Sequence, residues 1–127
     1  MNRTPIQLAA TVVGLAFLLA GIGGFIPGIT TDGELLGIFQ VGLLHNIIHI
    51  VFGLAGLAMA KTAAKTYLVG GGVIYLVVWL FGYFEGGTKM DVIGLNSGDN
   101  WLHLGAGLGM VVLGVLLGKS AMHKAAV

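Results

Sequence analysis

The 127-residue sequence contains no cysteine, and only 9% of its residues are charged. The lack of cysteine excludes disulfides, thiolate metal sites and cysteine nucleophiles. The scarcity of charge excludes a soluble domain, because a small protein has a large surface and needs polar side chains to cover it. It also excludes disorder, and a net charge of +1 provides no basic surface for nucleic acid. With 57% hydrophobic residues, the chain is predicted to be an integral membrane protein.

Long apolar runs define the expected fold. A helix that crosses a bilayer needs about 20 mostly apolar residues, and such runs predict spans at about 5–27, 38–60, 66–85 and 99–118. The runs lack the alternation of polar and apolar residues that is typical of barrel strands. The expected fold class is therefore an all-α membrane protein, a four-transmembrane-helix bundle that forms one domain over residues 1–127.

The charged residues indicate how these spans are oriented. Basic residues mark the two ends of the chain and the second loop, whereas acidic residues mark the first and third loops, where Lys89 is the only base. The basic group is Arg3, Lys61, Lys65, Lys119 and Lys124, and the acidic group is Asp32, Glu34, Glu85, Asp91 and Asp99. The positive-inside rule then predicts a multi-pass protein of the cell (inner) membrane with cytoplasmic N- and C-termini.

The second and fourth spans share the motif N-x-x-H-x-x-x-G-L. It begins at Asn46 in one span and at Asn100 in the other, an offset of 54 residues. Because Asn and His are rare in membrane spans, we expect an internal duplication of a helical hairpin, with repeats at 1–62 and 63–120. Two such hairpins keep the same orientation, which predicts a pseudo-twofold axis along the membrane normal. Chance similarity between two apolar helices is the alternative.

Glycine accounts for 23 residues of the chain. In lipid, small residues at helical spacing let helix backbones approach each other closely. On the second and fourth spans this spacing predicts helix-packing positions at Gly53, Gly56, Gly107 and Gly114. The alternative interpretation is that these glycines make room for a flat cofactor or a lipid tail.

Six polar residues within the spans form the candidate functional site. Residues three or four apart share a helix face, so the three on the second span and the three on the fourth each lie within about one turn. Polar groups at this depth must face the bundle or bind something, because lipid offers them no partners. The six are His45, Asn46, His49, Asp99, Asn100 and His103.

Several interpretations of this cluster remain open. In the first, Asn and His side chains form a hydrogen-bond network that locks the two hairpins together. In the second, the cluster binds a divalent metal ion. His45 and His49 have the i, i+4 spacing of a two-histidine metal face, His103 is the third nitrogen ligand, and Asp99 is an oxygen ligand or an acceptor for a ligand. The motif H-E-x-x-H is absent, which excludes a zinc peptidase.

A haem b site is a further possibility for the same cluster. His49 and His103 would be the two axial ligands, and Gly53 and Gly107 would make room for the ring. A proton- or quinone-linked role is another, because the pKa of histidine lies near neutrality. The inner halves of the spans carry no polar path, however, which disfavours a transporter. In the last interpretation, the protein is an accessory subunit whose helix faces rich in small residues pack against a larger membrane complex.

Two stretches of the sequence resemble the signatures of a known family. They are LLHNIIH at residues 43–49, followed by Gly53, and DNWLH at residues 99–103. The family comprises small bacterial four-helix membrane proteins of unknown function, frequent in actinobacteria, and the similarity spans roughly residues 8–118. The resemblance implies a four-span membrane domain and no established activity.

Taken together, the sequence favours a structural or accessory membrane protein with an intramembrane His/Asn cluster. The alternatives are a haem- or metal-binding redox protein that uses His49 and His103, and a proton- or quinone-linked membrane subunit. No catalytic motif is present, so an enzymatic role is not predicted. The expected partners are the lipid bilayer and either further copies of the chain or a larger membrane complex.

Overall fold

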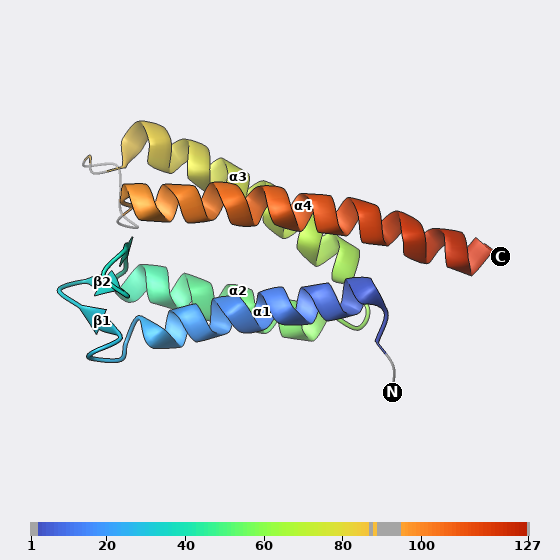
Figure 1. Ribbon diagram of the computed structural model, residues 1–127, viewed down its shortest axis with the longest axis horizontal. Coiled ribbons are helices and arrows are strands. Elements are labelled where there is room, and N and C mark those ends of the chain that lie inside the picture. Colours follow the sequence, from blue (N-terminus) through green and yellow to red (C-terminus); the bar gives the residue numbers. More distant parts are fainter. Residues whose placement is uncertain (1–2, 87, 89–94, 127) are drawn as a thin grey trace.

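The computed structural model describes residues 3–86, 88 and 95–126, with side chains described as far as residue 118. Four helices dominate it and lie roughly along one direction (Figure 1). They are α1 (Pro5–Gly23), α2 (Leu43–Met59), α3 (Ala64–Glu85) and α4 (Ser97–Ala126). The expectation of a predominantly helical chain is confirmed.

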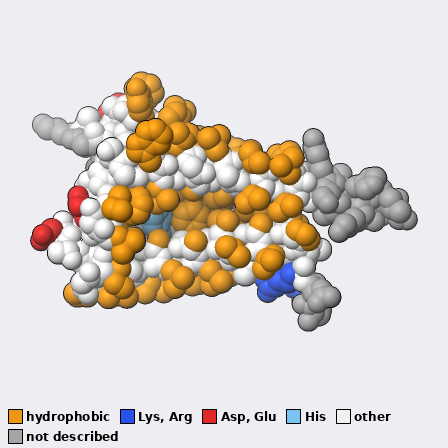
Figure 2. All heavy atoms as spheres, in the orientation of Figure 1, with side chains coloured by type: hydrophobic (Ala, Val, Ile, Leu, Met, Phe, Trp, Pro, Cys, Tyr) orange, Lys and Arg blue, Asp and Glu red, His pale blue; other side chains and the backbone are white. Residues whose placement is uncertain are grey.

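The helices are arranged as two antiparallel hairpins. Helix α1 packs along α2 and α3 packs along α4, whereas contacts between the two hairpins are fewer. Both ends of the chain lie at the same end of the bundle (Figure 1). Exposed apolar side chains run along the helices, while acidic side chains gather at one end and basic side chains at the other (Figure 2).

Three of the helical segments are long and apolar enough to cross a membrane. They are Pro5–Gly23, Ala64–Glu85 and Ser97–Gly118, and the remaining helix, Leu43–Met59, is apolar but has only 17 residues. These segments support the expectation of a multi-pass membrane protein. Lipid-facing side chains explain why so much apolar surface stays exposed, since hydrocarbon does not penalise it.

The second helix begins later than the sequence predicted, at Leu43 instead of position 38. The preceding residues form a small antiparallel sheet of β1 (Thr30–Thr31), β2 (Glu34–Leu35) and β3 (Phe39–Gln40). Asp32 and Gly33, at φ of 53° and 78°, make the two-residue turn between β1 and β2, which suits such a hairpin because both residues tolerate positive φ. The sheet closes the end of the α1–α2 hairpin that lies opposite the chain termini (Figure 1), and it buries Leu35.

Glycine permits the close approach of α1 to α2. A Cβ atom added to Gly53 would lie 2.6 Å from the carbonyl oxygen of Gly14, and one added to Gly14 would lie 2.9 Å from that of Gly53. An equivalent crossing joins α3 to α4, where the corresponding distances between Gly72 and Gly107 are 2.8 and 3.0 Å. Because these distances leave little or no room for a side chain, backbone lies directly on backbone at both crossings.

The remaining packing positions also face neighbouring helices. A Cβ on Gly56 would lie 2.6 Å from the ring of Tyr67, and one on Gly114 would lie 2.6 Å from the side chain of Val69. The Tyr67 hydroxyl donates a hydrogen bond of 3.0 Å to the carbonyl oxygen of Phe52. This bond links α3 to α2 and so ties one hairpin to the other.

Candidate functional site

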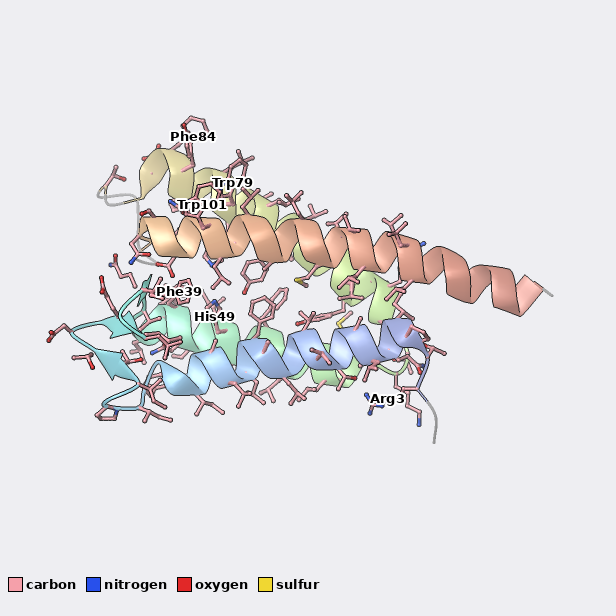
Figure 3. The ribbon with its side chains drawn as sticks, viewed as in Figure 1. Arg3, Phe39, His49, Trp79, Phe84 and Trp101 are labelled. Carbon is pink, nitrogen blue, oxygen red and sulfur yellow. The ribbon has the colours of Figure 1, made fainter. Side chains whose placement is uncertain are left out.

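Three histidines from the two hairpins meet between α2 and α4. His45 and His49 lie one turn apart on α2, and His103 faces them from α4. Their ring centroids are 4.4 Å apart for His45 and His49, 5.9 Å for His45 and His103, and 6.4 Å for His49 and His103. All three are buried, with 2 to 4% of each residue exposed. Figure 3 places His49 on the inward side of its helix.

The three rings are close enough to hold one metal ion. Each offers a nitrogen, and the three nitrogens lie within 4.8 Å of one another. An ion at the centre of such a triangle is at most about 2.8 Å from each nitrogen, against roughly 2.0–2.1 Å in a formed zinc–histidine bond. Binding therefore requires each ring to move inward by less than about 1 Å, a shift that small side-chain rotations supply.

A backbone hydrogen bond orients His45. Its Nδ1 lies 3.0 Å from the carbonyl oxygen of Gln40 at the end of β3. A carbonyl only accepts, so Nδ1 carries the proton and donates it, and the neutral ring then has its lone pair on Nε2. Metal-binding histidines are oriented in the same way, with one nitrogen donating to a carbonyl and the other binding the ion. The small sheet thus positions a side chain of the site through Gln40, a residue to which the sequence assigned no role.

His49 is buried with both of its ring nitrogens unpaired. Within the part of the chain that the structure describes, neither nitrogen has a hydrogen-bond partner, and Nδ1 of His103 also lacks one. The ring of His49 instead rests against Phe17, with centroids 5.7 Å apart. Leaving a buried polar group unsatisfied costs roughly 1–3 kcal/mol, which makes these nitrogens candidates for binding a further group.

The two asparagines contact the partner helix inside each hairpin. Nδ2 of Asn100 donates 3.2 Å to the carbonyl oxygen of Gly82 on α3. Asn46 lies against α1, where its side chain fills the space that a Cβ on Gly24 would occupy. Each asparagine therefore faces the partner helix of its own hairpin, and Asn100 is hydrogen-bonded to it.

Asp99 is buried at the start of α4, where it forms a reciprocal pair with Asn96. Its Oδ2 accepts a hydrogen bond of 3.0 Å from the backbone N–H of Asn96, and its own N–H donates 2.9 Å to Oδ1 of Asn96. This is a capping box, with an acidic residue three positions after the cap. Nδ2 of Asn96 also donates a hydrogen bond of 3.0 Å to the carbonyl oxygen of Ile38, which joins the start of α4 to the turn between β2 and β3. The asparagine-to-aspartate spacing before an apolar run was the available signal for Asn96.

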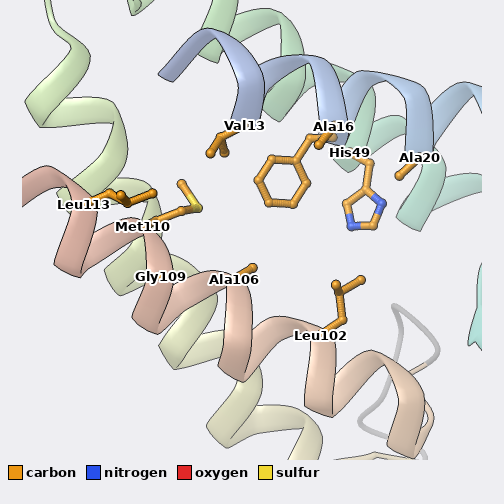
Figure 4. A pocket seen from close by; sticks show the side chains of 10 residues that line it. Val13, Ala16, Ala20, His49, Leu102, Ala106, Gly109, Met110 and Leu113 are labelled. Atoms are coloured by element: carbon orange, nitrogen blue, oxygen red, sulfur yellow. The ribbon is translucent and has the colours of Figure 1, made fainter. Parts of the chain in front are cut away.

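Three cavities meet at His49. One of about 280 Å³ lies between α1 and α4, one of about 250 Å³ lies between α2 and α3, and one of about 500 Å³ lies beneath the sheet. His49 lines all three, and His45 and His103 line the second. The walls are otherwise almost entirely apolar, and the first cavity is drawn in Figure 4. The cluster is therefore accessible from the sides of the bundle.

Comparison with known proteins assigns a family to this fold. Neither the curated proteins nor the solved structures contain a match to the chain. The family model described as "Domain of unknown function (DUF4383)" matches residues 7–116, which include both hairpins and all three clustered histidines. The chain therefore belongs to the DUF4383 family.

Proposed function

We propose that this protein binds one transition-metal ion within the membrane, held by His45, His49 and His103. The observation that carries the proposal is the convergence of three buried ring nitrogens within 4.8 Å of one another. Neutral imidazole is a common ligand for zinc, copper, iron and nickel, whereas calcium and magnesium require oxygen ligands. A borderline transition ion such as Zn²⁺ or Cu²⁺ is therefore the class of metal we assign.

Three protein ligands leave a coordination position open. Structural zinc sites are closed by four protein ligands, whereas sites that bind substrate keep a fourth position for water or another ligand. Here the cavities that meet at His49 would supply that space. The proposed role is accordingly to present an ion to a further ligand, and the ion would polarise an oxygen atom placed on it.

A purely structural hydrogen-bond network receives less support. Such a network needs bonds from the histidines across the hairpins, yet His49 has no hydrogen-bond partner among the described residues. Asn46 and Asn100, the other expected members, contact α1 and α3 within their own hairpins. The contacts thus favour an ion as the partner of the rings.

A haem b is also disfavoured by the local packing. His49 and His103 would have to lie on opposite faces of a macrocycle. The ring centroid of His45, however, lies 4.4 Å from that of His49 and 5.9 Å from that of His103, so His45 occupies the space beside both rings. The room expected at Gly53 is taken by the backbone of α1, and the room expected at Gly107 is taken by the side chain of Leu76 and the backbone of α3. A single ion fits this space and a flat macrocycle does not.

We further propose that the site lies in a bundle of four membrane spans, and that this bundle arose by duplication of a helical hairpin. Helix α2 rises about 25 Å over its 17 residues, near the lower limit for a span. The duplication is supported by the matching crossings, since Gly14 and Gly72 differ by 58 positions and Gly53 and Gly107 by 54. The first helices thus share one offset and the second helices another, as two copies of a hairpin would.

We propose that both termini face the cytoplasm. Arg3 precedes α1, and Lys61 is hydrogen-bonded to Gln7 in the first turns of that helix, so both lie at the end of the bundle that carries the termini (Figure 3). Asp32 and Glu34 lie at the opposite end, in the β1–β2 hairpin (Figure 1). This separation of charge follows the positive-inside rule. The histidine cluster then lies in the outer half of the membrane.

Elemental analysis of the protein purified in mild detergent tests the metal site. We expect about one equivalent of a transition metal in the natural protein, or after equilibration with Zn²⁺ or Cu²⁺ and removal of excess ion. His49→Gln and His103→Gln should each lose it, because an amide is a poor ligand for these ions. Protein without any bound metal would leave the structural or accessory role that the sequence favoured.

The fourth histidine provides a matched control. His123 lies 20 residues after His103 on the same helix, a separation of about 30 Å along the axis. His123→Gln should therefore retain the metal. Equal loss from this variant would mean that the ion binds outside the proposed cluster.

A further inference from the structure

The cavity between α1 and α4 forms a groove that leads from the side of the bundle to His49. We name it the lateral groove, and its walls include Ala16 and Ala20 on α1 and Ala106 and Gly109 on α4. Figure 2 shows a recess between the two helices in this face with histidine at its floor, and Figure 4 shows the ring of His49 between them. Small side chains on both walls keep the recess open to the lipid.

The lateral groove continues toward the outer end of the bundle. Ala20, His49 and Leu102 line both the groove and the larger cavity beneath the sheet. The combined space extends from the gap between α1 and α4 to the residues beneath the sheet, where Leu35 lines it. An elongated molecule fits such a space better than a compact one.

The equivalent cavity on the other side of the bundle is lined by bulkier side chains. With the two offsets of the proposed duplication, the cavity between α2 and α3 corresponds to the lateral groove, and His103 takes the place of His49. The three alanines of the groove are replaced by bulkier residues there. The replacements are Ile74 for Ala16, Val78 for Ala20 and Phe52 for Ala106. The small residues are therefore a property of one side, which a general need for tight packing does not explain.

The chemistry of the walls defines the ligand. None of the described residues that line the lateral groove is Lys, Arg, Asp or Glu. Asp99 lines the adjoining cavity beneath the sheet, but its Oδ2 already accepts a hydrogen bond from Asn96. A charged head in the groove would therefore be buried without a counter-charge beyond the ion. Among the residues that the structure describes, the ring nitrogens of His49 have no hydrogen-bond partner, and His49 lines the groove. A group with an uncharged oxygen would satisfy a nitrogen or occupy the open position of the ion.

We infer that the lateral groove binds a membrane-dissolved molecule with a long apolar tail and an uncharged hydroxyl or carbonyl head, and that the head lies at His49. This inference rests on the proposed function, because the ion supplies the strongest contact for the head. A lipid alcohol and a quinone share this chemistry. The substrate of the site would therefore arrive sideways from the bilayer, not from water.

Photolabelling in lipid nanodiscs tests the inference. The probe is hexadecanol with a diazirine in its chain, and labelled peptides are mapped by mass spectrometry. We expect labelling of the α1 and α4 segments that line the groove, and competition by excess unlabelled hexadecanol or by a benzoquinone with a decyl tail. The better competitor shows whether the bound head is the hydroxyl of an alcohol or the carbonyl of a quinone. Palmitate, which has a charged head, should compete at least about tenfold less well; equal competition by palmitate would overturn the uncharged head.

Gly109→Leu is the variant that blocks the groove. A Cβ at Gly109 meets nothing within 4 Å, so leucine can enter the open space without disturbing a helix contact. Groove labelling should fall about tenfold or more, the equivalent of roughly 1.4 kcal/mol. Gly70→Leu is the matched control, because Gly70 is exposed on α3, also has open space, and lies outside the groove. Equal labelling in the two variants would overturn the inference.

Metal content measured on the same samples separates the two proposals. Gly109→Leu should keep its ion while losing groove labelling, because no metal ligand is changed. A natural protein that labels in the groove but holds no metal would refute the metal site alone. A protein that holds its metal but gives no labelling dependent on Gly109 would refute the groove ligand alone.

Discussion

Phe17 and Tyr75 stack face to face where the two hairpins meet, with ring centroids 4.8 Å apart and an angle of 15° between their planes. Phe52 packs edge-on against both rings, at 5.1 and 4.9 Å. His49 contacts Phe17, and His103 contacts Tyr75 at 5.2 Å. The aromatic stack thus joins α1 to α3 and supports the histidines from the inner side of the bundle.

The Tyr75 ring and its hydroxyl should contribute differently to stability. The hydroxyl is buried without a hydrogen-bond partner among the described residues, so Tyr75→Phe should leave the melting temperature in detergent unchanged or raise it. Tyr75→Leu should lower stability by about 1–3 kcal/mol, because the stack and its contacts are lost. A large loss in the phenylalanine variant would show that the hydroxyl has a partner in the native protein.

The glycine crossings should not tolerate larger side chains. Gly53→Leu and Gly107→Leu should each destabilise the protein by about 1–3 kcal/mol or more, since leucine must push apart backbones that already touch. Gly70→Leu, which meets open space, is the control and should melt as the natural protein does or higher. Thermal unfolding in detergent measures all three. Unchanged melting of the two crossing variants would mean that those faces are not helix contacts.

The capping box of α4 predicts a smaller effect. Asn96→Ala removes the cap acceptor for Asp99 and the bond to Ile38, and should cost about 1 kcal/mol, with 2 kcal/mol as the upper end. Ser97→Ala, at the exposed neighbouring position, should cost much less. The comparison uses the same thermal measurement, and equal costs would contradict a capping role for Asn96.

Removal of the ion should destabilise the protein only when the cluster is intact. A ligand present at about a hundred times its dissociation constant stabilises the folded state by roughly 2.7 kcal/mol. A chelator should therefore lower the melting temperature of the natural protein and of His123→Gln. It should leave His49→Gln unaffected. A chelator effect of the same size in His49→Gln would place the ion elsewhere.

Reporter fusions test the orientation. A reporter placed at Thr88, between α3 and α4, should be active only as an external fusion, and one placed after Val127 only as a cytoplasmic fusion. The expectation follows from the distribution of Lys and Arg. The opposite result at either position would reverse the proposed orientation and place the histidines in the inner half of the membrane.

The sequence alone determined the class of protein and the approximate position of each helix. Scarce charge and long apolar runs have one stable outcome in lipid, because every backbone group must be paired within a helix. Local patterns also marked the glycines that the structure places at the crossings, since helical spacing puts residues such as Gly53 and Gly56 on related faces. Each of these properties depends on one segment of the chain at a time, so the local sequence pattern was sufficient to predict it.

Only the tertiary structure decided which polar residues share a site. Asn46 lies beside His45 in sequence, yet it faces α1 while the histidine faces the other hairpin, because successive helical residues point about 100° apart. The late start of α2 and the contact of Gln40 with His45 depend on the sheet, which two positive-φ turns create before the helix begins. The open lateral groove is also a tertiary property. Small residues leave a recess only when the packing of the hairpins brings no larger side chain to fill it.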